Sequence, residues 1–257
     1  MILTVDIGNT ETVLGIFDHD QLLGHWRLST HPERTVDEYG LLLRALLRES
    51  NVEPGAIAGV AIASVVPPLT PAVTEACQRY LGAFTVLVDA TSKLPIRLDV
   101  DEPLSVGADR IANTLAAARL YRTDTIAVDL GTATTFDCIS GDGVFLGGVI
   151  APGVRTGAEI LTRRTARLPR VDLDPPAAVI GRRTDTALQS GIFYGAVESI
   201  DGIVRRIRTE WGNQPKVVAT GGLARFLAPH CSCIDLVEPF LTLHGLRFAW
   251  DVLRPDS

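Results

Sequence analysis

An internal duplication constrains this 257-residue chain more than any other feature of its sequence. The segment VDIGNT at 5–10 aligns with VDLGTA at 128–133, an offset of 123 residues. The same offset, without a gap, pairs Ile16 with Ile139, Asp18 with Gly141, Leu23 with Leu146 and Gly24 with Gly147. Chance aligns two short D-x-G motifs more readily than two complete strand–turn–strand–turn–strand patterns. We therefore predict two structurally similar halves that face each other across a cleft.

Short strands that alternate with helices predict α/β layers in both halves. Hydrophobic periodicity places strands at 2–6, 11–17, 21–28, 57–63, 84–88, 125–129, 133–139, 143–150, 216–219 and 234–236. Helices are expected at 34–50, 70–81, 107–121, 153–163, 185–210 and 240–252, with an Arg- and Pro-rich excursion at 164–183. The predicted domains are residues 1–118 and residues 119–257.

Each half carries an acidic residue and then a glycine at the end of its first strand. Gly8 and Gly131 permit tight turns in which the backbone approaches a ligand closely. Asp6 and Asp129 place carboxylates at the strand ends, where Mg²⁺ or another hard cation can be held beside phosphates. Backbone N–H groups and polar side chains that can contact an anion follow at Asn9, Thr10, Thr132, Ala133 and Thr134.

One such turn taken alone is more often a plain hairpin turn. Two at equal offset, each with an acid and hydroxyl groups, favour a clamp for the polyphosphate of a nucleotide. A weaker signal is Gly221-Gly222 after the strand KVVAT. It suits either a third close approach of the backbone, to a nucleoside, or a simple helix-entry turn.

The segment Gly107-Ala108-Asp109-Arg110 opens a predicted helix. An acid in the first helical turn is favoured by the helix dipole, which is a purely structural role for Asp109. Its functional alternative is to accept the proton of a substrate hydroxyl during phosphoryl transfer. Arg110 can pair with a phosphate or with a substrate carboxylate. The spacing alone leaves the two roles of Asp109 open.

Composition argues against several other classes of protein. Lys and Arg number 24 against 30 Asp and Glu, a net charge of −6, which disfavours a nucleic-acid partner. Neither Lys93 nor Lys216, the only lysines, lies in a G-x-x-x-x-G-K-[ST] motif, so a P-loop is excluded. The densest basic stretch is interpreted as a solvated helix end or loop and comprises Arg163, Arg164, Arg167 and Arg170.

The sequence also predicts a cytoplasmic protein without a membrane partner. No apolar run approaches the roughly 18 residues of a membrane span. The N-terminus has no basic region and meets Asp6 early, unlike a signal peptide. Free thiols, rather than disulfides or a zinc site, are expected at Cys77, Cys138, Cys231 and Cys233.

Several segments together carry a family resemblance. They are DIGNTETV at 6–13, ASVVPPLT at 63–70, VGADRIAN at 106–113, VDLGTATTFD at 128–137, GGVIAPG at 147–153, the stretch 180–204 with QSGIFYG, ATGG at 219–222 and LTLHGL at 241–246. Over nearly its whole length the chain resembles the type III pantothenate kinases, within the acetate/sugar kinase–Hsp70–actin superfamily. The resemblance implies a duplicated actin-like, ribonuclease H-like α/β fold, with two similar mixed-sheet halves flanked by helices around a central cleft.

The resemblance also implies an activity and its site. The expected reaction is ATP-dependent phosphorylation of pantothenate to 4′-phosphopantothenate, the first step of coenzyme A biosynthesis, with Asp109 as proton acceptor. Residues implied to bind ATP are Asp6, Ile7, Gly8, Asn9, Thr10, Glu11, Thr12, Val13 and Thr132. Residues implied to bind pantothenate are Gly107, Ala108, Asp109, Arg110 and Thr184.

The same resemblance implies Mg²⁺, a monovalent cation and a homodimer. Asp129 is the implied ligand of K⁺ or NH₄⁺, and Asp6 is a candidate water-mediated ligand of Mg²⁺. One position departs from the family, because Val100 stands where a substrate-pocket Tyr is often found. The alternatives are a non-catalytic nucleotide-binding or regulatory homologue, and a sugar or acetate kinase of the same superfamily.

Overall fold

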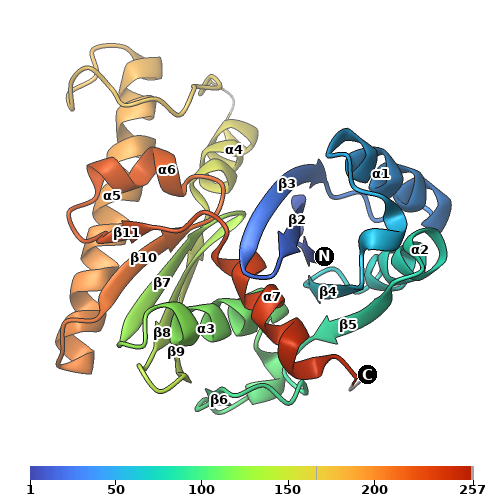
Figure 1. The fold of residues 1–257 in the computed structure, drawn as a ribbon. Coiled ribbons are helices and arrows are strands. Elements are labelled where there is room, and N and C mark those ends of the chain that lie inside the picture. The colour runs from blue at the N-terminus through green and yellow to red at the C-terminus, as the bar shows by residue number, and fades with distance from the viewer. Residues whose placement is uncertain (166, 256–257) are drawn as a thin grey trace. The chain divides into compact units, whose positions relative to one another are not determined.

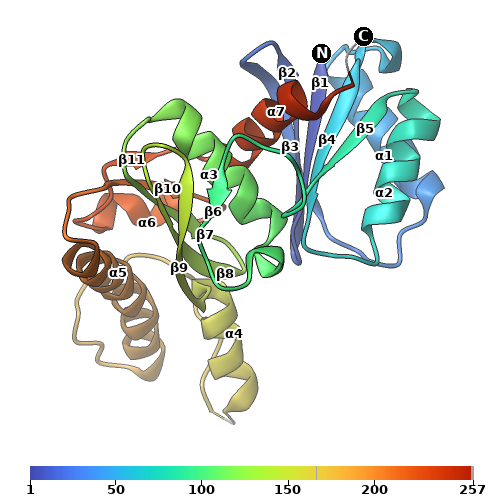
Figure 2. The same cartoon turned by 90° about the horizontal axis from the view of Figure 1, so that it is seen from below.

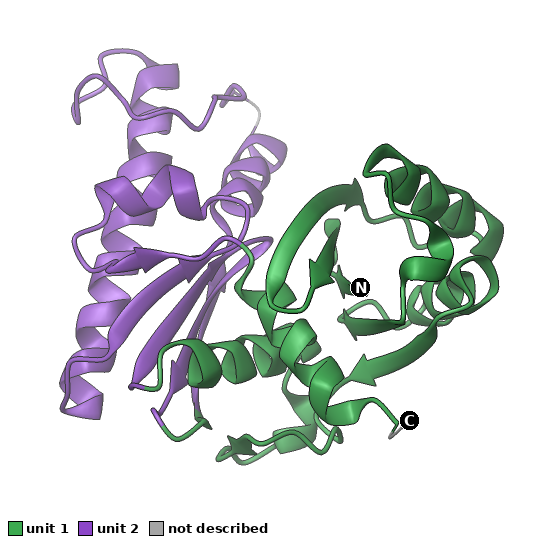
Figure 3. Cartoon of the chain, in the orientation of Figure 1, with its two compact units in different colours: residues 1–122, 142–145, 240–257 green, residues 123–141, 146–239 purple. Residues whose placement is uncertain are grey.

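The computed structural model describes residues 1–165 and 167–255. Contacts along the chain divide it into two compact units (Figure 3). Unit 1 comprises Met1–Arg122, Asp142–Phe145 and Phe240–Ser257, and unit 2 comprises Thr123–Gly141 and Leu146–Pro239. Within the described residues, no helix is long and apolar enough to cross a membrane.

Unit 1 is built on a five-stranded mixed sheet in the order β3-β2-β1-β4-β5. β1 pairs antiparallel with β2 and parallel with β4. The strands are β1 (Ile2–Ile7), β2 (Glu11–Asp18), β3 (Gln21–Ser29), β4 (Gly59–Ser64) and β5 (Phe84–Val88). The helices are α1 (Val36–Glu49), α2 (Thr70–Leu81), α3 (Ala108–Leu120) and α7 (Leu241–Leu253) (Figures 1 and 2).

The alternation of side chains along the central strands gives this sheet two buried faces. Val60 and Ile62 of β4 pack in the core that includes residues of α1 and α2. Ala61 and Ala63, the alternate residues, pack in the core that includes residues of α3 and α7. Successive strand residues point to opposite faces, so a continuous apolar run can supply both cores.

Unit 2 repeats the same strand order, β9-β8-β7-β10-β11. Its strands are β7 (Thr125–Leu130), β8 (Ala133–Ile139), β9 (Val144–Pro152), β10 (Lys216–Thr220) and β11 (Leu236–Val237). Its helices are α4 (Val154–Arg164), α5 (Thr184–Trp211) and the short α6 (Ala224–Leu227). The first residues of β9 belong to unit 1, where they pair parallel with β6 (Arg97–Leu98).

The duplication is visible in the strand boundaries. β1 and β7 begin and end at positions 123 residues apart, as do β3 and β9. The turns between the first two strands of each unit differ by one residue. Ile7 pairs with Thr12 in unit 1, whereas Leu130 pairs with Thr134 in unit 2. The prediction of an α/β fold with two similar mixed sheets is confirmed.

The C-terminal helix belongs to a different unit from the one that the predicted domain boundary gives it. α7 packs in unit 1 although it ends the chain. A Cβ on Gly59 of β4 would lie 1.7 Å from the Trp250 ring, and one on Gly245 would lie 2.0 Å from the Ala112 carbonyl oxygen of α3. Glycine at these positions lets α7 approach β4 and α3 closely, a pairing that strand and helix periodicity does not encode.

Candidate active site

The turn at Gly8, which the sequence predicts to bind phosphate and which we call the first phosphate turn, connects β1 and β2 in unit 1. The Gly8 N–H donates to the Glu11 carbonyl oxygen at 3.0 Å, which closes the turn. A Cβ on Gly8 would lie 2.9 Å from that same oxygen, so the turn requires glycine. Thr30, the residue after β3, donates through its hydroxyl to the Gly8 carbonyl oxygen at 2.7 Å. Sequence reasoning missed Thr30, which has no motif around it.

Several side chains of this turn have partners within the protein. Glu11 accepts a hydrogen bond from Arg27 at 2.7 Å, and the Thr12 and Thr30 hydroxyl oxygens lie 3.0 Å apart. Ile7 is fully buried, and Val13 pairs with Asp6 across the β1–β2 ladder. These side chains build the turn.

The segment 107–110 lies beside the end of β1. The Val65 N–H donates to the Ile7 carbonyl oxygen at 3.0 Å, and a Cβ on Gly107 would lie 3.6 Å from a Val65 methyl group. α3 begins at Ala108 with Gly107 as its N-cap, as expected. The structure therefore brings Asp109 and the first phosphate turn to the same edge of the unit 1 sheet.

The carboxyl group of Asp109 folds back toward the start of its own helix. The Arg110 N–H donates to Asp109 Oδ1 at 2.9 Å. A Cβ on Gly107 would lie 2.5 Å from Oδ1, so a side chain there would displace the carboxylate. Burial raises the pKa of Asp109 above its ordinary 3.8, against the opposing effects of the Arg110 N–H and the Arg110 charge. A raised pKa makes this carboxylate a stronger proton acceptor.

The corresponding turn of unit 2, at Gly131, is also predicted to bind phosphate, and we call it the second phosphate turn. The carboxylate of Asp129 at this turn lies against Gly221, the residue that follows β10. Asp129 pairs with Thr135 and Thr220 in the neighbouring strands. Gly221 has a φ of +88°, and a Cβ there would lie 2.3 Å from Asp129 Oδ1. The Gly221-Gly222 pair therefore lies in a turn before α6. Its backbone also approaches another group closely, but within the protein that group is the Asp129 carboxylate. The space beside the Asp129 carboxylate, which we call the cradle, would be filled by any side chain at position 221.

The N-terminus of α4 closes on the same turn. Gly153 is the N-cap of α4, and a Cβ there would lie 2.2 Å from the Thr132 carbonyl oxygen. The Thr156 hydroxyl donates to that oxygen at 2.8 Å. The side chain of Thr132 is exposed. A helix N-terminus directed at an exposed turn is a favourable place for phosphate.

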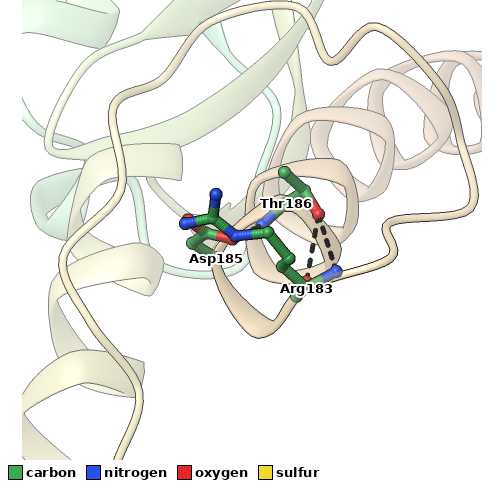
Figure 4. Close-up of polar contacts among 3 residues, drawn as sticks. All are labelled: Arg183, Asp185 and Thr186. Carbon is green, nitrogen blue, oxygen red and sulfur yellow. Dashed lines mark hydrogen bonds and ion pairs between the residues drawn. The ribbon is translucent and has the colours of Figure 1, made fainter.

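Thr184 is the first residue of α5, and its side chain is exposed. The adjoining residues order the helix start (Figure 4). The Arg183 N–H donates to the Thr186 hydroxyl oxygen at 3.1 Å, and this hydroxyl donates to the Arg183 carbonyl oxygen at 3.0 Å. Arg183 also forms an ion pair with Asp185 at 2.5 Å. These contacts hold Thr184 in place at the exposed helix start.

Val100 is half-buried in unit 1 and follows β6 by two residues. The Asp99 N–H beside it donates to the Phe145 carbonyl oxygen at 2.9 Å. Phe145 was not predicted as part of the site. It lies 35 residues after Arg110, and no local motif links the two residues. Their side chains are in contact in the folded chain.

Solved structures share this fold. A Campylobacter jejuni protein assigned to the Baf family of transcriptional activators aligns with a TM-score of 0.61 and 22% identity, over 97% of this chain and 98% of that one. An N-acetylglucosamine kinase from Porphyromonas gingivalis aligns with a TM-score of 0.52 and 16% identity, over 99% and 100%. These likenesses show the fold class alone, an α/β protein with two mixed sheets of similar strand order flanked by helices.

Sequence comparison narrows this class to one family. The family model for type III pantothenate kinase matches residues 2–206. The type III pantothenate kinase of Moorella thermoacetica is 45% identical over 98% of this chain and 99% of that protein. The one from Bacillus cytotoxicus is 41% identical over 98% and 96%. The chain belongs to the type III pantothenate kinase family, which confirms the predicted resemblance.

Proposed function

We propose that this chain transfers the γ-phosphoryl group of ATP to the primary hydroxyl of pantothenate, with Asp109 as the proton acceptor. Family membership supports the reaction, 4′-phosphopantothenate formation at the entry to coenzyme A biosynthesis. The observation that carries the role of Asp109 is its half-buried carboxylate beside the first phosphate turn, with a raised pKa. A phosphotransferase needs such a group to position and deprotonate its alcohol.

In this proposal the predicted domains, residues 1–118 and 119–257, each contain one phosphate turn, although α7 at the end of the second range packs in unit 1. The turn at residues 6–13 contributes backbone N–H groups, and Thr132 contributes at the start of α4. Gly107, Ala108 and Arg110 bind the acceptor around Asp109. Fixed donors of this kind stabilise charge that develops on the transferred phosphoryl group without costly reorganisation.

The carboxylates of Asp6 and Asp129 suit cations that keep water or phosphate oxygens as ligands, rather than a metal held entirely by protein side chains. Within the described residues, no three His, Cys, Asp or Glu side chains gather into a metal-binding group. Single carboxylates at strand ends suit ions whose remaining ligands are water and phosphate oxygens. We assign Mg²⁺ to Asp6 through water, and K⁺ or NH₄⁺ to Asp129 in the cradle that Gly221 leaves open. When bound, these ions neutralise phosphate charge that otherwise repels the nucleophile.

The exposed face of α5 supports a homodimer. Ala187, Gly191 and Gly195 are exposed, and Cβ atoms on the two glycines would meet nothing within 4 Å. Val179 and Ile180, just before this helix, are 64% and 83% exposed. Small side chains let a second helix approach closely, and exposed aliphatic residues favour burial against another protein. We place the dimer contact on this face.

Subunit mixing determines which site Thr184 serves. Asp109→Asn and Thr184→Ala variants would be combined, dissociated and reassociated. If Thr184 acts in the partner's site, mixed dimers contain one complete site, and about a quarter of wild-type activity returns after random pairing. If Thr184 acts in its own subunit's site, no activity returns.

A cytoplasmic location belongs to the same proposal. The four cysteines Cys77, Cys138, Cys231 and Cys233 are all unbridged. Free thiols are usual in a reducing compartment.

One assay separates the candidate functions. ADP release would be measured with Mg²⁺ and either K⁺ or NH₄⁺, with pantothenate, a hexose, acetate or no acceptor. Pantothenate-dependent ADP release is expected. ATP binding without turnover under every condition would support the non-catalytic homologue, and turnover only with a hexose or acetate would support another kinase. The match to the Baf protein, at 22% identity, shows the fold alone and does not favour a regulatory role.

A further inference from the structure

Arg110 makes one contact that the proposed reaction does not yet use. Its guanidinium carbon lies over the ring of Phe145, 5.0 Å from the ring centroid. Phe145 is 1% exposed, and Arg110 is half-buried. A guanidinium over an aromatic face is attracted by the ring's negative electrostatic potential, more strongly where water is excluded.

The Phe145 ring is held by the backbone around it. Phe145 lies near the start of β9, opposite Leu98 in the parallel pairing with β6. The Asp99 N–H donates to the Phe145 carbonyl oxygen at 2.9 Å, and the Arg97 N–H donates to the Gly143 carbonyl oxygen at 3.0 Å. These bonds on both sides fix the strand segment, so the ring is a rigid surface rather than a mobile partner.

The backbone of Arg110 is fixed equally well. The Thr114 hydroxyl donates to its carbonyl oxygen at 2.8 Å, and its N–H donates to Asp109 Oδ1 at 2.9 Å. With the backbone set by α3, the ring of Phe145 restricts where the long side chain lies. The attraction to the ring acts on the charge of the guanidinium, and the same group can bind an anion through its N–H donors.

We propose that Phe145 is a positioning residue that holds the Arg110 guanidinium for the carboxylate of the acceptor substrate. This inference rests on the proposed function. The acceptor, rather than ATP, is favoured because Arg110 adjoins Asp109, whose carboxylate must touch the acceptor's hydroxyl. The carboxylate is the acceptor's only charged group, and a guanidinium with restricted rotamers loses less entropy on binding it.

The test compares Phe145→Leu, Phe145→Tyr and Arg110→Ala in steady-state kinetics with ATP and pantothenate. Phe145→Leu removes the aromatic face and is expected to raise KM for pantothenate about three- to thirty-fold, with kcat and KM for ATP little changed. Phe145→Tyr keeps an aromatic face under the guanidinium, and its KM for pantothenate should stay close to the wild-type value. In the Arg110→Ala background, Phe145→Leu should add little to KM, since it acts through Arg110.

Phe17→Leu is the matched control. Phe17 is also a fully buried aromatic of unit 1, on β2, where it contacts the His244 ring at 5.3 Å. It should lower thermal stability as Phe145→Leu does and leave KM for pantothenate unchanged. Phe145→Met replaces the leucine variant if that variant does not fold.

The possible results distinguish failure of the role proposed for Phe145 from failure of the proposed kinase activity. A wild-type chain without pantothenate-dependent turnover overturns the proposed function. An active wild type whose Phe145→Leu variant keeps a normal KM for pantothenate overturns the role of Phe145 alone. An increase confined to KM for ATP, or full additivity with Arg110→Ala, also overturns it.

Discussion

A Cβ on Gly221 would lie 2.3 Å from the Asp129 carboxylate, although the two residues are 92 positions apart in the chain. β10 and β7 pair in parallel, so Thr220 stands beside Asp129, and the left-handed backbone of Gly221 then turns inward against the carboxylate. The packing of one glycine therefore sets the space available around the proposed ligand of the monovalent cation.

Gly221→Ala is expected to reduce kcat/KM by about a hundredfold, the usual consequence of displacing a binding group by roughly 1 Å. The activity that remains should need more K⁺ or NH₄⁺ for half-maximal stimulation. Gly212→Ala is the control, because Gly212 also has a positive φ, +75°, but a Cβ there meets nothing within 4 Å. It should cost about 1–2 kcal/mol of stability and leave the cation dependence unchanged. Equal cation dependence in both variants would contradict the assignment of Asp129.

Asp109→Asn is expected to lower kcat by about 10²–10⁴-fold while ATP still binds. The same variant should not lose thermal stability at neutral pH and should gain some. Since the pKa of Asp109 is raised in the folded protein, ionisation of this carboxyl costs stability once the pH rises through that pKa, and asparagine avoids the cost. Scanning calorimetry at pH 7 and at acidic pH should show the gain shrinking as the pH falls. Near-normal kcat would refute the role of Asp109.

The pH profile of kcat/KM for pantothenate follows from the same shift. The proton acceptor must be ionised, so activity should decline as the pH falls through a pKa above 3.8. The Arg110 charge opposes this shift, and Arg110→Gln should therefore move the acid limb to still higher pH. An acid limb at or below pH 3.8 in the wild type, or no movement in the variant, would be inconsistent with Asp109 as the titrating group.

Thr156→Val removes the hydroxyl that donates to the Thr132 carbonyl oxygen. We expect a stability loss of about 1 kcal/mol and a several-fold rise in KM for ATP, because α4 no longer holds the second phosphate turn. Thr162→Val is matched to it on the same helix, where the hydroxyl donates to the Ala158 carbonyl oxygen of its own helix at 3.2 Å. A rise in KM for ATP of the same size in both variants would exclude a specific role for Thr156.

Gly195→Gln places a long side chain on the exposed face of α5, where the monomer has room for it. The variant should fold normally but elute as a monomer in size-exclusion chromatography with light scattering. Gly55→Gln tests whether the effect is specific, because Gly55 in unit 1 also has no neighbour within 4 Å of an added Cβ. A wild-type monomer, or a dimeric Gly195→Gln variant, would contradict the dimer contact on this face.

The sequence by itself determined the strands other than β6, the two acidic glycine turns and the helix that starts at Ala108, with Asp109 in its first turn. These features are local: apolar periodicity, a glycine where the backbone must turn and an acid at a helix start are each encoded within a few residues. The constant offset of 123 residues also anticipated the equal strand order of the two sheets.

Only the tertiary structure decided which distant residues complete each turn. Thr30 on Gly8, Thr156 on Thr132, Gly221 on Asp129 and Phe145 on Arg110 are pairs separated by many residues. The same holds for α7, which ends the chain but packs on β4 and α3 of unit 1. Such contacts depend on strand register and on how closely elements can pack. Neither is written in local periodicity, since a one-residue change of register redirects every side chain.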